Sequence, residues 1–87
     1  MRLYVYTMFD SKAEAYQTPF YSHNHATAIR SVMSMSNNPE HPYGMYKKDF
    51  TLFCLGMFDD ETGDLEVSEA KLNLGLLNDF YKTEIET

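Results

Sequence analysis

Residues 50–59 read Phe-Thr-Leu-Phe-Cys-Leu-Gly-Met-Phe-Asp, and this stretch decides the fold. Apolar residues occupy both faces of any strand that forms here. A strand buried on one face alternates apolar with polar residues, whereas a strand buried on both faces does not. We therefore expect a central strand over 50–58 with both faces covered, by helices, by a partner chain or by a ligand such as stacked nucleobases.

The chain has 87 residues, which predicts one domain over 1–87 with a small core. Its single cysteine, Cys54, excludes an intramolecular disulfide and suits a reducing cytoplasm. The first residues do not resemble a signal peptide, and no stretch approaches the ~20 apolar residues of a membrane span. We therefore expect a cytoplasmic protein that does not enter a membrane.

The formal net charge of −6 is unevenly distributed along the chain. Residues 1–48 carry a net charge of +2, and residues 49–87 carry −8. An acidic chain binds nucleic acid weakly, because phosphate neutralisation supplies most of the non-specific affinity. Any DNA contact is therefore expected in the first half, and the simplest interpretation of the second half is an acidic, solvated surface.

Periodicity and turn residues predict an α+β fold with the order β-β-α-β-β-α, built as a small antiparallel or mixed sheet with two helices. Two prolines and a glycine make residues 37–48 an irregular loop, and residues 83–87 are expected to be a frayed tail. Gly63 suits a left-handed turn position before the last strand. The expected strands span 2–9, 15–21, 50–58 and 64–67, and the expected helices span 24–36, with Asn24 as the N-cap, and 69–81.

Aromatic residues on the strands form the first candidate site. Tyr4 and Tyr6 share a strand face, and Phe53 joins them if the strands pair in the matching register. Aromatic side chains on a sheet stack bases at about 1–3 kcal/mol each. The alternative is that these rings fill the core or a dimer interface. With the cations that would neutralise phosphates, the predicted nucleic-acid-binding residues are Arg2, Tyr4, Tyr6, Arg30, Lys47, Lys48 and Phe53.

A homodimer is the second way to cover the strand over 50–58. Two helices of modest length cover only one of its faces, and a symmetric partner would cover the other. Methionine adapts to irregular surfaces and suits such a contact. The predicted interface residues are Met8, Leu55 and Met57.

No residue pattern indicates catalysis. His23 and His25 do not match a standard zinc spacing, and the acidic turn over 59–64 lacks the ligand pattern of a calcium loop. The chain has no evident nucleophile-and-base set and no phosphate-binding glycine loop. We predict a protein that is not an enzyme and that holds no metal or cofactor.

Three blocks of sequence carry a resemblance to a known family. The chain resembles, over most of residues 2–67, the small nonstructural protein of gokushovirus-type Microviridae, which are tailless single-stranded DNA phages. The blocks are Leu3-Tyr4-Val5-Tyr6 with Asp10-Ser11-Lys12-Ala13, then Thr18-Pro19-Phe20 with Asn24-His25-Ala26-Thr27-Ala28-Ile29-Arg30, then residues 49–59 with Thr62-Gly63.

The resemblance implies a nonstructural accessory protein in the host-cell cytoplasm. Such a protein would assist genome replication or the switch to single-stranded DNA synthesis, with single-stranded DNA or replication proteins as its partners. The charge distribution leaves a second hypothesis open. In that hypothesis the chain is a protein-binding module that acts on a host or phage protein through its acidic surface, without nucleic-acid contact.

Overall fold

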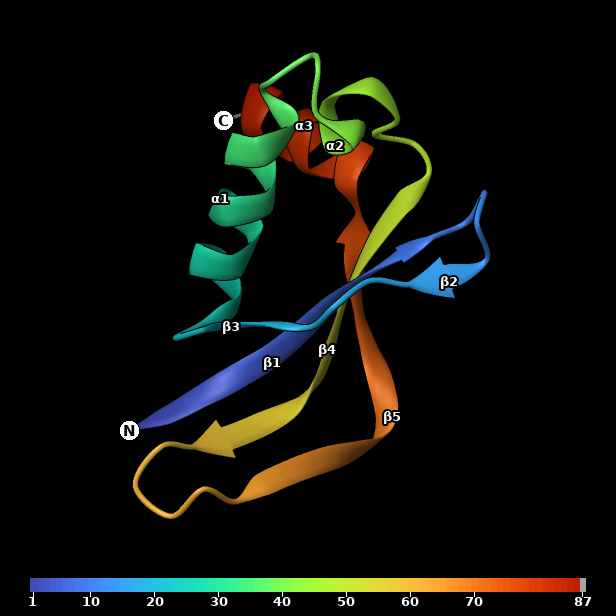
Figure 1. Cartoon of the computed structure of the whole chain (residues 1–87). Coiled ribbons are helices and arrows are strands. Elements are labelled where there is room, and N and C mark those ends of the chain that lie inside the picture. The colour runs from blue at the N-terminus through green and yellow to red at the C-terminus, as the bar shows by residue number, and fades with distance from the viewer. Residues whose placement is uncertain (87) are drawn as a thin grey trace.

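The computed structural model describes the backbone of residues 1–86 and the side chains of residues 1–81. Over these residues the elements follow in the order β-β-β-α-α-β-β-α and form one antiparallel sheet with helices (Figure 1). The predicted α+β class is therefore confirmed. The strands are β1 (Arg2–Asp10), β2 (Ala15–Tyr16), β3 (Phe20–Ser22), β4 (Phe50–Asp59) and β5 (Leu65–Leu76), and the helices are α1 (His25–Ser36), α2 (Pro42–Met45) and α3 (Leu77–Glu86).

The strand β4 lies in the middle of the sheet, as predicted for residues 50–58. It pairs with β1 on one side and with β5 on the other, and both pairings are antiparallel. The short strands β2 and β3 replace the single strand expected over 15–21, and both pair with the outer edge of β1. The interruption contains Pro19, which lacks the N–H needed to continue a ladder.

The register between β1 and β4 assigns each side chain to a face. Tyr6 lies opposite Cys54, whereas Thr7 lies opposite Phe53. Directly opposite residues share a face of an antiparallel sheet, and neighbours along a strand point to opposite faces. The register that would place Phe53 on the same face as Tyr4 and Tyr6 is therefore not the one that forms, and Phe53 lies on the opposite face. A bulge at Leu55 shifts the register between the two strands, which the sequence pattern did not reveal.

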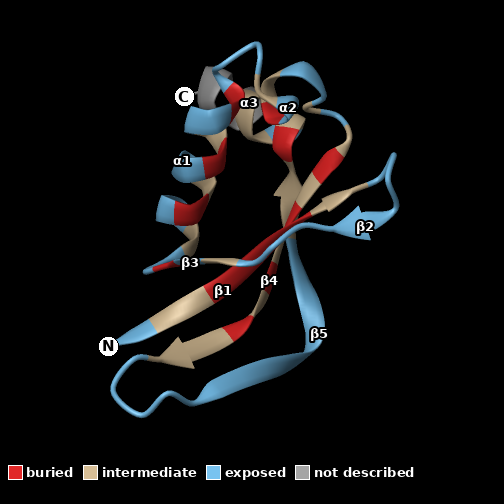
Figure 2. Cartoon of the chain, in the orientation of Figure 1, coloured by how far each residue is buried: buried red, intermediate tan, exposed pale blue. Residues whose placement is uncertain are grey.

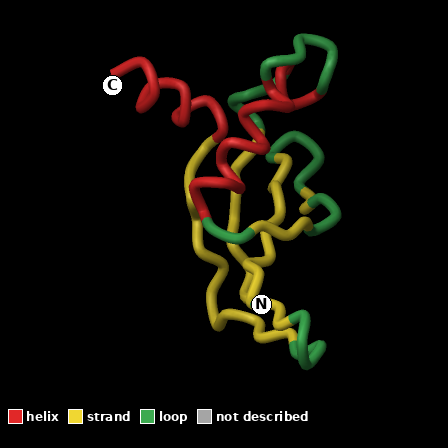
Figure 3. Tube along the Cα trace, turned by 90° about the vertical axis from the view of Figure 1, so that its left-hand side faces the viewer, coloured by secondary structure: helices red, strands yellow, loops and turns green. Residues whose placement is uncertain are grey.

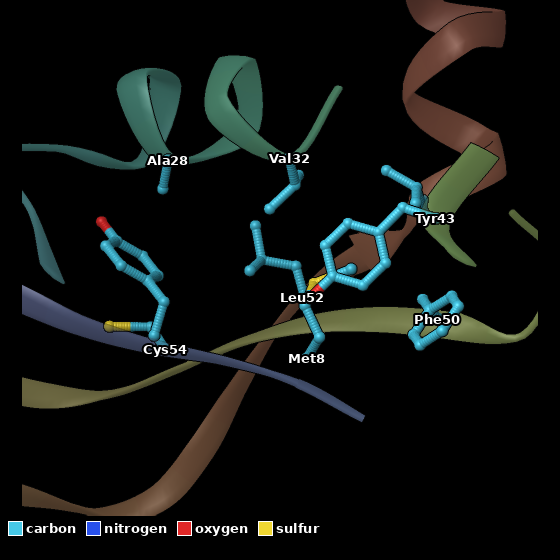
Figure 4. Packing of buried hydrophobic residues seen from close by; sticks show 9 residues of the cluster. Met8, Ala28, Val32, Tyr43, Phe50, Leu52 and Cys54 are labelled. Carbon is cyan, nitrogen blue, oxygen red and sulfur yellow. The ribbon is translucent and has the colours of Figure 1, made fainter. Parts of the chain in front are cut away.

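The core lies between α1 and one face of the sheet, which we call the helix face. Ala28 and Val32 of α1 point toward Met8 and Leu52 of the strands (Figure 4). All four side chains are almost completely buried. The helix begins where predicted, because the Asn24 side chain accepts a 2.8 Å hydrogen bond from the Thr27 N–H.

The last third of the chain differs from the prediction. Residues 69–76 continue β5, and the final helix begins at Leu77 rather than at residue 69. The apolar residues Leu72 and Leu76 are four positions apart, and this spacing keeps side chains on one side of a strand as well as of a helix. Leu74 between them completes an alternating pattern, which favours a strand.

Two smaller regions also bear on the predictions. The loop over 37–48 contains the single helical turn α2, which has Pro42 in its first turn and is capped by the His41 side chain. Gly63 has a φ of 77°, which is the left-handed conformation predicted for it. The backbone of α3 continues to Glu86, while Thr87 lies outside the described residues, so fraying over 83–87 stays a prediction.

A large bulge in β5 bends the lower part of the sheet. Gly56 of β4 pairs with Val67, but Cys54 pairs with Leu72, so residues 68–71 have no partner in the β4 register. The strand turns sharply at this point (Figure 1). The backbones come very close here, because a Cβ added at Gly56 would overlap the carbonyl oxygen of Glu66. Glycine is therefore required at this position.

The helices cover only one face of β4 and leave its lower part free. Phe50, Leu52 and Cys54 are buried on the helix face, while Phe53 and Leu55 on the opposite face are only half-buried. The strands extend beyond the helices, and most of β5 is exposed (Figures 2 and 3). The expectation that both faces are covered is thus met on the helix face over residues 50–54 and only in part on the opposite face, which we call the open face.

We predict that Gly56→Ala destabilises the protein by about 2 kcal/mol or more, because the new methyl group must push β4 and β5 apart. Urea unfolding monitored by circular dichroism measures this change. Ser68→Ala in the same bulge is the control, since Ser68 is exposed, and it should stay within about 0.5 kcal/mol of the wild type. Equal stability of Gly56→Ala and the wild type would contradict the close approach of the two strands.

Candidate functional site

Two of the predicted aromatic residues belong to the core rather than to a binding surface. Tyr6 is fully buried, and its hydroxyl lies 2.7 Å from His25 Nδ1. Its ring stacks on Phe20, and the half-buried Tyr4 ring lies 4.7 Å from the His25 ring. Burial raises the pKa of Tyr6 to about 12, with smaller contributions from Cys54 and Tyr4. These rings hold the start of α1 against β1, so they are not free to stack on bases.

Arg2 lies on β1 near the N-terminus, where no helix covers the sheet. Its guanidinium is 2.7 Å from a Glu66 carboxylate oxygen on β5. Both side chains are more than half exposed, so the pair contributes about 1 kcal/mol at most. Arg2 therefore forms an ion pair with Glu66 and is separated from the other predicted cations.

Two predicted cations lie near the ring of Tyr81, a residue outside the predicted site. The Lys47 ammonium nitrogen lies 4.8 Å from the centre of the Tyr81 ring. Arg30 and Tyr81 both line a hollow of about 210 Å³ between α1 and α3. Lys48 is exposed next to Lys47. We call this region the Tyr81 surface, and its residues are Arg30, Ser34, Asn37, Lys47, Lys48 and Tyr81.

The packing of α3 holds the Tyr81 ring in place. Its hydroxyl donates to the Met33 carbonyl oxygen at 3.1 Å and also bonds the Ser36 hydroxyl on α1. No aspartate or glutamate occurs between residues 15 and 39, so α1 presents Arg30 without an acidic neighbour on the same helix. The absence of acidic residues between 15 and 39 is the sequence signal that could indicate this surface. The position of Tyr81 beside α1 could not be predicted from the sequence pattern, because it depends on the contact between α1 and α3.

Phe53 lies on the open face, in what we call the aromatic row of Phe9, Tyr16 and Phe53. The ring centres of Phe9 and Tyr16 are 4.8 Å apart, and those of Tyr16 and Phe53 are 5.8 Å apart. The Lys71 ammonium nitrogen lies 5.5 Å from the Tyr16 ring centre. The structure thus places Phe53 in an aromatic site with a cation, but with none of its predicted companions.

The open face also carries a groove of about 310 Å³. Its floor is apolar and is formed by Val5, Leu55 and Gly56. The segment with Pro19 lines one side, where the Thr7 hydroxyl donates to the Gln17 carbonyl oxygen at 2.7 Å and holds the segment over the sheet. We call this feature the open groove, and its other lining residues are Tyr21, Leu65, Glu66, Val67, Ser68, Glu69, Ala70 and Lys71.

The three predicted interface residues do not share a surface. Leu55 lines the open groove, but Met8 is 1% exposed in the core beneath the helices. Met57 pairs with Tyr4 and therefore belongs to the helix face. Met8 cannot contact a partner in the folded chain, so the predicted interface is wrong for this residue.

Other chemistry is limited among the residues that the structure describes. His23 is exposed and His25 bonds Tyr6, and no group of three or more histidine, cysteine or acidic side chains is arranged to hold a metal ion in residues 1–81. None of the helices described is long and apolar enough to span a bilayer.

We predict that stability falls as the pH rises from about 10 to 12, because the unfolded state loses the Tyr6 proton first when the folded pKa is raised. Burial also raises the pKa of Tyr43, which adds to this loss. Melting temperatures across this pH range should fall less steeply in Tyr6→Phe than in the wild type. Tyr46→Phe, at an exposed position, is the control and should follow the wild type. Identical slopes for Tyr6→Phe and the wild type would contradict the buried hydroxyl.

Comparison with known proteins places the chain in a phage family. A family model described as Phage ORF5 protein matches residues 3–80, which is nearly the whole chain. No curated protein and no solved structure matches the chain. The matched region includes β1 from its second residue, β2 to β5, the first two helices and the start of the third. The chain therefore belongs to the Phage ORF5 protein family.

Proposed function

We propose that this protein is a nonstructural accessory protein of a single-stranded DNA phage, acting in the host cytoplasm during genome replication or the switch to single-stranded DNA synthesis. It acts by binding rather than by catalysis, and it contacts single-stranded DNA through the Tyr81 surface. Family membership supports the phage setting, and the resemblance to gokushovirus nonstructural proteins supports the replication step. The observation that supports the DNA contact is the grouping of two cations around Tyr81. Arg30 lines the same hollow as Tyr81, and the Lys47 ammonium lies against the Tyr81 ring.

The local charge of the Tyr81 surface favours phosphate even though the whole chain is acidic. Arg30 and Lys48 are exposed, and neither forms an ion pair within residues 1–81. Their charges are therefore available to a phosphate backbone, and counterion release on contact would supply the binding free energy. Because the chain carries a net charge of −6, we expect weak binding that disappears as the salt concentration rises.

The Tyr81 ring supplies the second element of a single-strand site. Proteins that bind single strands without sequence preference combine cations along the backbone with an aromatic ring that stacks on bases. Asn37 and Ser34 line the same hollow and offer hydrogen-bond donors to phosphate or base edges.

Fluorescence anisotropy with a labelled oligothymidylate tests this proposal. We predict that Arg30→Gln with Lys47→Gln weakens binding about tenfold at low salt. The slope of log K against log salt should also become shallower by about 0.7 for each phosphate that the variant no longer neutralises. The matched control is Lys12→Gln with Lys71→Gln. It removes the same charge from the β1–β2 turn and the open face, and should change affinity by about twofold or less.

The outcomes distinguish three alternatives. A larger loss of affinity in the control pair would assign DNA to the aromatic row and the open face. Equal losses in both pairs would indicate non-specific attraction to net charge. Absence of binding even at low salt would exclude direct DNA contact, since electrostatic attraction is strongest there. Each of these results would contradict the proposed DNA site.

A further inference from the structure

We propose that the open groove binds an extended, basic segment of a protein partner. The site is separate from the Tyr81 surface, because the groove lies on the open face of the sheet and α1 packs on the helix face. The protein would then hold DNA on one side and a partner protein on the other. The inference rests on the shape, the free backbone and the charge of the groove.

The groove exposes more apolar surface than the folding of a lone chain requires. Val67, Leu65 and Tyr21 line it and are 76%, 56% and 53% exposed. Concave apolar sites with a few polar groups at the rim are typical of ligand and partner binding. Val5 and Leu55 on the floor are already buried or half-buried, so the exposed side chains of the walls would gain most from an occupant.

The backbone beside the groove has unused hydrogen-bonding capacity. Within the described residues β5 pairs only with β4, so its outer edge is open. In addition, the bulge residues 68–71, which line the groove, have no partner in the β4 register. An extended peptide can add to such an edge through main-chain hydrogen bonds while its alternate side chains enter the adjacent pocket.

The charge around the groove selects a basic occupant. Residues 59–69 contain six acidic residues and no lysine or arginine. Glu66, Glu69 and Lys71 line the groove itself. Glu66 is paired with Arg2, and the Lys71 ammonium nitrogen lies 5.5 Å from the Tyr16 ring centre. Glu69 forms no ion pair among the described residues, so it is the acidic group of the lining that an occupant can meet. An acidic rim repels DNA phosphates and attracts lysine or arginine side chains.

The same acidic rim argues against a second copy of the chain. A two-fold contact across β5 brings identical surfaces together, so Glu66 and Glu69 of one protomer would face those of its partner near the axis. Like charges opposite each other across an interface are unfavourable. An extended partner segment in which apolar and basic residues alternate would instead place its apolar side chains on the floor of the groove and its cations beside the acidic rim.

A fluorescein-labelled synthetic peptide of alternating lysine and valine is the probe, with a peptide of alternating glutamate and valine as its control. We expect the basic peptide to bind in an anisotropy titration and the acidic one not to bind. Val67→Ser should weaken binding about tenfold, because it removes the most exposed apolar contact of the groove. Leu72→Ser is the matched control, since Leu72 is an exposed apolar residue of β5 outside the groove, and it should leave binding unchanged.

The charge contribution has its own pair of variants. Glu69→Gln should weaken binding of the basic peptide, whereas Glu61→Gln, which removes an equal charge from the exposed β4–β5 turn, should not. Equal losses of affinity in both members of either pair would overturn the groove as the site. A loss of oligothymidylate binding in Val67→Ser but not in Leu72→Ser would reassign the groove to DNA. A dimer in light scattering that dissociates on Val67→Ser would reassign it to a second copy, and both results would also overturn the proposal.

Discussion

One constraint shapes this fold: the central strand β4 is apolar on both faces, but the chain supplies helices for only one of them. Packing of α1 over Met8 and Leu52 closes the helix face and forms the core. In a chain of 87 residues, few residues are then available to cover the other face. Its cover consists of residues 16–21 and the bent strand β5, which leaves Phe53 and Leu55 half-buried. Apolar surface that folding leaves uncovered in this way is available for binding.

The bulge where β4 meets β5 determines the shape of that open face. Only glycine at position 56 allows the two backbones to approach as closely as they do. Because residues 68–71 leave the ladder, β5 bends toward the open face and forms a wall of the groove. The groove and the Tyr81 surface then lie on different sides of the sheet, with opposite local charge. This separation is the physical basis for proposing that one small protein contacts both DNA and another protein.

Sequence periodicity predicts the elements that depend on local rules. The central strand follows from a continuous apolar run, the cap at Asn24 from side-chain capping and the turn at Gly63 from left-handed backbone. Each of these patterns acts over a few residues. The helix predicted over 69–81 is wrong over residues 69–76, because a spacing of four is compatible with either structure. The candidate site is harder to predict. Register decides that Tyr6 is buried and Phe53 faces away from it, and the α1–α3 contact brings Tyr81 to Arg30; both are tertiary features.

Solvent paramagnetic relaxation along β4 tests the central claim most directly. A soluble gadolinium chelate relaxes protons according to their distance from solvent, and NMR reads the effect residue by residue. We predict alternation, with Phe53 and Leu55 relaxed strongly and Leu52 and Cys54 protected by the helices. Equal protection of all four side chains would contradict this account, because it would mean that the second face of the strand is closed.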